Sequence, residues 1–245
     1  MKKLFLSLVA DIVAATATYA QNSLIAVLSH EGEVSTFYGI TALREAHDAA
    51  ENGDVITLSS GTFNSCDITK AVTIRGAGME VNSETGALPT IIQGAFKINI
   101  PETVEERFTL EGIHTNYSIR YYGTLRNPIF MKCFILEITY YDYNSLMKDA
   151  TIIHCFMAKL RLSRDSSASC INSYIYWPEN ASSGSSIYEF SNCIIDYYGD
   201  LWRSTISNSI IFNHGGPLDG NNNVYSTISE ISDATGSWNN SNIFQ

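Results

Sequence analysis

The sequence carries little charge and contains no recognisable catalytic or metal-binding motif. Asp, Glu, Lys and Arg together make up only 16% of its 245 residues. No CxxC pair and no His/Cys ligand spacing is found, which argues against a structural zinc site. The five cysteines are an odd number, in a chain too long to be a small disulfide-stapled scaffold. The sequence therefore says more about architecture than about chemistry.

The charge that is present is mostly negative. The formal net charge is −10 and the isoelectric point is near 4.9, which argues against a nucleic-acid partner. Beyond the N-terminal stretch, no apolar run is long enough to cross a membrane as a helix. We therefore expect neither a nucleic-acid partner nor a membrane span.

The N-terminal residues are typical of an export signal. Lys2 and Lys3 precede the apolar run Leu4–Ala10, and small residues end at Ala20. Asp11 interrupts the apolar stretch, so an N-terminal core strand or helix is the alternative. We predict a signal peptide over residues 1–20 and a secreted, periplasmic or cell-surface location.

A helix followed by a strand is predicted next. Ala42, Leu43, Ala46, Ala49 and Ala50 recur at helical spacing and predict a helix over Ala42–Glu51 with one narrow apolar stripe. Asn52-Gly53 is a good helix stop, and the alternation over 55–60 predicts a strand.

This stretch resembles the N-terminal cap of secreted right-handed parallel β-helix proteins, the pectate-lyase-like superfamily. The matching residues are Glu45-Ala46, Ala49-Ala50, Gly53-Asp54-Val55-Ile56-Thr57-Leu58 and Gly61-Thr62-Phe63. The resemblance implies an all-β fold, with residues 21–63 as an N-terminal cap that includes the helix and the first strand. It leaves the activity open, because the superfamily holds lyases, hydrolases, epimerases and inactive adhesins.

A repeat follows the cap. Bend residues recur at intervals of 14 to 22 residues, with apolar residues two positions earlier; the bends are Gly76, Gly94, Gly112, Lys132, His154, Asn172, Asn192, Asn208 and Asn222. Stacked coils share one core, which a single coil cannot form alone. The pattern predicts about nine coils over residues 64–229, an internal asparagine ladder at the later bends, and a tail or partial cap over 230–245. The tail offers no amphipathic helix, so a partner covering that end is one alternative.

The cysteines fit the same repeat. Cys133, Cys155 and Cys193 each follow a bend residue directly, and Ser173 and Ser209 occupy the same position in other coils. We interpret this column as small buried side chains. A Cys133–Cys155 disulfide between neighbouring coils is the alternative.

Catalytic candidates are few. The best basic cluster is Arg161 and Arg164 with Asp165, and the other acidic candidates are Asp142, Asp196 and Asp200. A lyase needs a base beside carboxylates that hold calcium, and a hydrolase needs two carboxylates around one sugar bond. Solvated surface charge is the favoured interpretation of all of them. We expect no metal or other cofactor, with calcium only under the lyase alternative.

Aromatic residues offer a different kind of site. Aromatic residues recur after successive bends; the candidates for stacking on sugars are Tyr176, Trp177, Tyr197, Tyr198 and Trp202. Packing on neighbouring strands is the alternative role for these residues. We hypothesise an exported, non-catalytic protein with weak polysaccharide binding or an adhesin-like role. The alternatives are a polysaccharide lyase, a glycoside hydrolase, or a shortened inactive copy of one.

Overall fold

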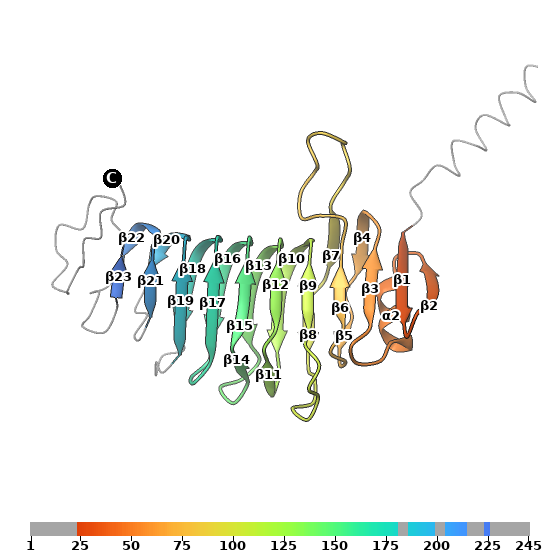
Figure 1. The fold of residues 1–245 in the computed structure, drawn as a ribbon, viewed down its shortest axis with the longest axis horizontal. Helices are drawn as coiled ribbons and strands as arrows, with labels where there is room; N and C mark the ends of the chain where they lie inside the picture. The colour runs from red at the N-terminus through yellow and green to blue at the C-terminus, as the bar shows by residue number, and fades with distance from the viewer. Residues whose placement is uncertain (1–23, 181–185, 199–203, 215–222, 226–245) are drawn as a thin grey trace, which may run out of the picture.

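The chain folds as a parallel β-solenoid of about 7 turns (Figure 1). The structure is a computed structural model that describes residues 24–180, 186–198, 204–214 and 223–225. The predicted signal peptide, the predicted tail and Asn222 lie outside these residues. Within the described residues no helix is long and apolar enough to cross a membrane.

Two long sheets run along the solenoid. Sheet A is 11-stranded and has the strand order β2 (Glu33–Tyr38), β1 (Ile25–His30), β3 (Val55–Leu58), β6 (Thr73–Arg75), β9 (Thr109–Glu111), β12 (Ile129–Met131), β15 (Ala150–Ile153), β17 (Ser167–Ile171), β19 (Ile187–Ser191), β21 (Thr205–Ser207) and β23 (Asn223–Tyr225). From β3 onward all neighbours in sheet A are parallel.

Sheet B is 10-stranded and follows the same path on the other side of the core. Its main order is β4 (Gly61–Asn64), β7 (Thr90–Gln93), β10 (Ile113–Tyr121), β13 (Phe134–Tyr140), β16 (Phe156–Leu162), β18 (Tyr174–Asn180), β20 (Ile194–Tyr198) and β22 (Ile210–His214). The short strands β5 (Asp67–Ile68) and β8 (Phe96–Ile98) join it, and β11 (Thr124–Arg126) pairs with β14 (Leu146–Lys148) in a separate 2-stranded sheet.

The helix α2 (Ala42–Ala49) packs against the first strands of both sheets (Figure 1). Its buried apolar residues are Ala42, Leu43 and Ala46, and the two small alanines let the helix lie close to the strands. The helix ends two residues before the predicted Glu51, because Ala50 already has an extended backbone (φ −72°, ψ 164°).

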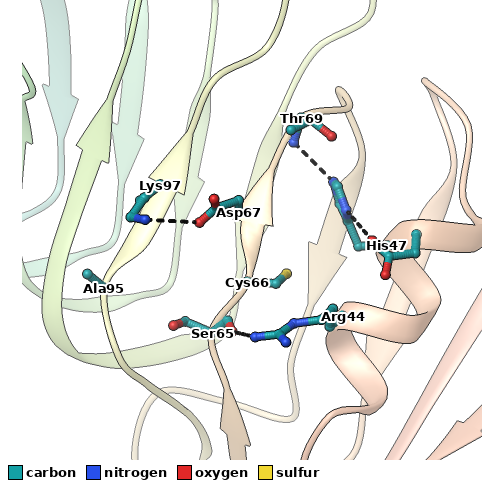
Figure 2. Close-up of a pocket in the computed structure, with 9 residues that line it drawn as sticks. Arg44, His47, Ser65, Cys66, Asp67, Thr69, Ala95 and Lys97 are labelled. Atoms are coloured by element: carbon teal, nitrogen blue, oxygen red, sulfur yellow. Dashed lines mark hydrogen bonds and ion pairs between the residues drawn. The ribbon is translucent and has the colours of Figure 1, made fainter.

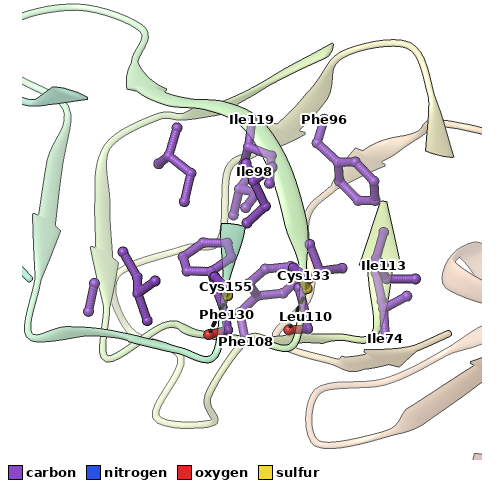
Figure 3. Close-up of a cluster of buried hydrophobic side chains, with 14 of the residues drawn as sticks. Ile74, Phe96, Ile98, Phe108, Leu110, Ile113, Ile119, Phe130, Cys133 and Cys155 are labelled. Carbon is purple, nitrogen blue, oxygen red and sulfur yellow. Dashed lines mark hydrogen bonds between the residues drawn. The ribbon is translucent and has the colours of Figure 1, made fainter. Parts of the chain in front are cut away.

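The core is a set of columns, one residue per coil, as the repeat predicted (Figure 3). In-register pairing of the sheet A strands stacks buried apolar side chains at one offset: Ile74, Leu110, Phe130, Ile152, Cys170, Phe190 and Ile206. Phe108 and Phe130 meet edge to face inside it, with centroids 6.2 Å apart. Burial along this column gives each coil the apolar contacts that it cannot make alone.

One predicted bend was wrong. Ile74 pairs directly with Leu110, and Gly76 N–H donates to Glu111 O at 2.8 Å, so Gly112 follows Gly76 in the row of bends. Gly94 belongs to a different bend, where Ser65 N–H donates to Gln93 O. The coil that begins at Gly76 therefore contains a long insertion, 76–89, which projects from the solenoid between β6 and β7 (Figure 1).

The predicted internal asparagine ladder was also wrong. Asn172, Asn192 and Asn208 do form left-handed bends, with φ of 50°, 54° and 46°. Their side chains are exposed, because at each bend this residue points outward and the next one points into the core. The bend chemistry was predicted correctly and the direction of the side chains was not.

Cysteine and serine side chains form an interior polar column instead. Cys133, Cys155 and Cys193 are buried, as are Ser173 and Ser209. Cys155 N–H donates to Ser173 Oγ at 3.1 Å, and Cys193 N–H donates to Ser209 Oγ at 3.0 Å. All five cysteines are free thiols, so the alternative Cys133–Cys155 disulfide is not present.

Candidate functional site

The outer face of sheet B carries a row of stacked rings. His114, Phe134, Phe156 and Tyr174 occupy one register position on β10, β13, β16 and β18. Successive centroids are 4.4, 4.9 and 4.6 Å apart, close to the distance between neighbouring strands. We call these four residues the ring row. Because each ring covers the face of the next, the row presents ring edges to solvent.

A second row of exposed apolar side chains lies farther along the same strands. Tyr117, Leu136 and Tyr176 are 49%, 45% and 47% exposed, and Trp177 is 39% exposed. The register shift between Thr115 and Ser118 gives β10 an additional residue here. We call Tyr117, Leu136, Tyr176 and Trp177 the central row. Neither tyrosine belongs to a stacked ring pair in the described part of the chain, unlike the rings of the ring row.

A group of charged side chains, two cations around one carboxylate, borders the central row. The Lys159 ammonium lies 2.7 Å from Glu179 Oε2 and 5.3 Å from the centre of the Trp177 ring. Arg161 Nη2 donates to both carboxylate oxygens of Glu179, at 3.1 Å each. Partial burial opposes ionisation of Glu179, but its hydrogen bonds with Lys159 and Arg161 outweigh this and lower its pKa. Glu179 therefore stays ionised and holds both cations in place.

Lys159 has a second glutamate beside it, Glu137. The two residues are direct neighbours on β13 and β16. The ion pair of Lys159 nevertheless goes to Glu179, on the next strand.

A cluster of tyrosines lies where β10 and β13 end. The rings of Tyr122 and Tyr141 stack with centroids 4.2 Å apart, and those of Tyr140 and Tyr143 are 5.7 Å apart. Desolvation raises the pKa of Tyr140, and the nearby Arg161 opposes this rise. The outer face of sheet B thus has aromatic rings at the start, middle and end of its strands.

The three catalytic candidates do not form one cluster. Arg161 is bound by Glu179 on the sheet, whereas Arg164 and Asp165 are exposed in the turn after β16. Arg164 Nε lies 3.4 Å from Asp165 Oδ2, and Asp165 has a left-handed backbone with φ 61°. The geometry of Arg164 and Asp165 is that of a surface turn.

The other acidic candidates are also held by local structure. The Asp142 carboxylate accepts hydrogen bonds from Asn144 N–H and Ser145 N–H at 3.0 Å each, which closes a turn. Asp196 accepts a hydrogen bond from the Tyr174 hydroxyl at 2.9 Å. Asp200 lies outside the described residues. Within the described ranges, no three His, Cys, Asp or Glu side chains are grouped so that they could hold a metal ion.

The aromatic candidates divide between described and undescribed residues. Tyr176 and Trp177 lie on the outer face of sheet B, as a glycan platform requires. The backbones of Tyr197 and Tyr198 belong to β20 and pair with Asn213 and His214, but their side chains lie outside the description. Trp202 lies outside the described residues altogether.

Sequence reasoning missed the ring row. Its signal was present, because each of these rings stands two positions after a bend residue: Gly112, Lys132, His154 or Asn172. In the sequence, the repeat is identified from the positions two before and one after each bend, and both of those point inward.

Two hollows lie away from this face. One, of about 540 Å³, is lined by residues of α2, β5 and β8, including Arg44, His47, Cys66, Asp67 and Lys97 (Figure 2). Burial raises the pKa of the Cys66 thiol to about 12, so it is not a nucleophile at neutral pH. The other, of about 600 Å³, lies between the 76–84 segment and the bends at Gly112 and Lys132.

Comparison with protein-family models, with curated proteins and with solved structures finds no significant match for this chain. The arrangement of its own residues is therefore the basis for any functional conclusion.

Proposed function

We propose that this chain is an exported, non-catalytic β-solenoid that binds neutral polysaccharide on the outer face of sheet B. The observation that carries the proposal is the central row, in which exposed aromatic and aliphatic side chains from β10, β13 and β18 lie on the outer face of one sheet. Apolar faces of sugar rings pack on such surfaces, and the surrounding polar groups hydrogen-bond their hydroxyls.

The charges beside the central row favour a neutral ligand. Lys159 and Arg161 are both held by Glu179, so a uronate would have to compete with a carboxylate that is already in place. The chain as a whole carries a formal net charge of −10 and repels acidic polymers at low salt.

The proposal includes the finer architecture and location that the sequence predicts. In it the solenoid is a right-handed, pectate-lyase-like β-helix of about nine coils, α2 caps its N-terminal end, and residues 1–20 direct export. A partner covers the C-terminal end. The resemblance over 45–63 and the packing of α2 on β1 to β4 support this reading.

The test compares binding with cleavage. Affinity for a panel of neutral plant and host polysaccharides is measured for the wild type and for Tyr176→Ala and Trp177→Ala. Ile187→Ala, which removes an exposed apolar side chain from sheet A, is the control. We expect each central-row variant to weaken binding roughly tenfold, about 1.4 kcal/mol, with the control unchanged.

The alternative is a lyase or hydrolase that uses the same face. Incubation with pectins and neutral polysaccharides, with and without calcium, distinguishes the two. Unsaturated products or new reducing ends that disappear in Arg161→Ala or Asp165→Ala would replace the binding proposal with an enzymatic one. Equal affinities for all variants would place any binding elsewhere.

A further inference from the structure

The strand β2 forms one edge of sheet A and has a single neighbour, β1, among the described residues (Figure 1). Five of its six residues are exposed, and Val34 and Tyr38 are 65% and 64% exposed. The strand contains no Lys, Arg or Pro, the residues that usually protect an open edge from pairing.

The side chains of β2 divide between two faces. Phe37 and Ser35 lie opposite the buried Ala26 and Leu28, so they are on the core side. Val34, Thr36 and Tyr38 therefore lie on the outer face of sheet A. The outer face of the edge strand is thus built from β-branched and aromatic side chains.

The backbone N–H and C=O groups of β2 also alternate, between the side that faces β1 and the opposite side of the strand. Gly39 N–H donates to Leu24 O at 2.8 Å, so the odd-numbered residues turn their N–H and C=O groups toward β1. Ile25, the partner of Tyr38, accepts from Ser59 N–H on its other side at 2.9 Å. The N–H and C=O groups of Val34, Thr36 and Tyr38 consequently face the open edge.

We propose that two copies of this chain associate through β2, antiparallel, about a two-fold axis at Thr36. Residues that face each other across an antiparallel ladder turn their backbone groups either both toward it or both away from it, so Val34, Thr36 and Tyr38 must lie opposite one another. This rule allows the symmetric register in which Val34 lies opposite Tyr38 of the second copy and Thr36 lies opposite Thr36.

The side chains of β2 suit that register. It creates two Val–Tyr pairs and one Thr–Thr pair on the outer face, which are among the favourable cross-strand combinations. The one charged residue of the strand, Glu33, lies opposite Gly39 of the second copy, so no like charges meet. Because both copies use the same edge, the assembly closes at two chains.

The first measurement is the solution mass by sedimentation equilibrium over a range of concentrations, on purified chain whose N-terminus is determined by mass spectrometry. We expect a reversible monomer–dimer equilibrium. Val34→Lys should raise the dimer dissociation constant at least tenfold. Val81→Lys is the matched control, because Val81 is 55% exposed on the projecting segment.

The second measurement fixes the register and does not depend on a destabilising change. The native cysteines are all buried, so a cysteine introduced on β2 is the accessible thiol. In the proposed register the two Thr36→Cys residues face each other at about 5.5 Å between Cα atoms, within the roughly 4.4–6.8 Å of a disulfide. Thr36→Cys should therefore form a disulfide between the two copies when oxidised glutathione is added. The two cysteine thiols are oxidised, and glutathione takes up their electrons and protons and is released as two reduced thiols.

Val34→Cys is the control at the same edge, since its two copies would lie about 14 Å apart along the strands. Dimers that cross-link through residue 36 and not through residue 34 support the proposal. Monomers up to the solubility limit, assembly beyond two chains, or cross-linking through residue 34 alone would each overturn it.

Discussion

The rings of Phe134 and Phe156 stack with centroids 4.9 Å apart and planes only 7° apart. Phe156 makes a second stack, with Tyr174, at 4.6 Å. Both contacts follow from the register of β13, β16 and β18, which sets equivalent residues one strand spacing apart. The ring row therefore stabilises the solenoid along its axis while remaining partly exposed.

Phe156→Ala should destabilise the protein although its side chain is 37% exposed. Each aromatic pair contributes about 0.5–1.5 kcal/mol beyond area burial, and the substitution removes two pairs. We expect a loss of about 1–3 kcal/mol in the free energy of unfolding, measured by urea denaturation. Tyr176→Ala, in the central row, should cost clearly less, and equal losses would show that the stacking contributes nothing.

The bend at Asn192 should be sensitive to backbone rather than to side-chain chemistry. Its φ of 54° is unfavourable for alanine and free for glycine. Asn192→Ala should cost about 1–2 kcal/mol, and Asn192→Gly should be close to neutral. Thermal and urea unfolding of the two variants tests this. Equal destabilisation by Ala and Gly would mean that the amide itself matters, as the wrong ladder prediction assumed.

The region around α2 should become less stable in mild acid because of His47. This side chain is buried, and its Nε2 accepts a hydrogen bond from Thr69 N–H at 3.2 Å. Desolvation lowers the pKa of His47, and the Lys70 charge lowers it further. Since the unfolded chain binds a proton near pH 6.5 and the folded chain resists it, stability should fall as pH drops below about 6.5.

His30 should contribute with the opposite sign. The hydrogen bond between His30 and Asp54, 2.9 Å long, raises the pKa of His30 in the folded protein. The stabilisation from this hydrogen bond is therefore complete in acid and is lost as pH rises through the pKa of His30 in the folded protein. The two effects are separated by melting His47→Gln and His30→Gln across pH 5–8. The decrease in melting temperature toward pH 5 should become smaller in His47→Gln and not in His30→Gln. A pH dependence of the melting temperature that is unchanged in His47→Gln would contradict the role of His47.

Lys70 should be important for holding α2 in place. Its ammonium donates to the carbonyl oxygens of His47, Asp48 and Ala50, at 3.0, 2.8 and 2.6 Å. These are carbonyls at the end of the helix, where a positive charge is favourable. Lys70→Met should cost about 1–2 kcal/mol. Lys97→Met is the control, because the Lys97 ammonium makes only an exposed ion pair with Asp67, at 3.6 Å. This variant should leave the free energy of unfolding nearly unchanged.

Much of the fold was predictable because a solenoid repeats its offsets. The buried Ile152, Phe190 and Ile206 and the cysteine and serine column were identified correctly from spacing alone. The insertion was hidden, because Gly94 lies at the expected interval of 18 residues from both Gly76 and Gly112. Spacing measures distance along the chain, and only strand pairing shows which residues are neighbours.

The candidate site was less predictable, for a different reason. Tyr176 and Trp177 were correctly placed on an exposed strand face, but exposure of Asn172 and Asn192 depends on which way a left-handed bend turns its side chain. The ion pairs of Glu179 with Lys159 and Arg161 join consecutive coils, and Glu179 itself was not among the candidates. Such contacts depend on the side-chain geometry of neighbouring strands.

The most direct test of the central claim measures the fluorescence of Trp177 during polysaccharide binding. The sequence contains three tryptophans, so replacing Trp202 and Trp238 with Phe leaves the central row as the only indole fluorophore. Titration with a neutral polysaccharide that the wild type binds should shift the emission to shorter wavelength and reduce acrylamide quenching, and no cleavage products should form. Binding that leaves emission and quenching unchanged would contradict a polysaccharide site on the outer face of sheet B.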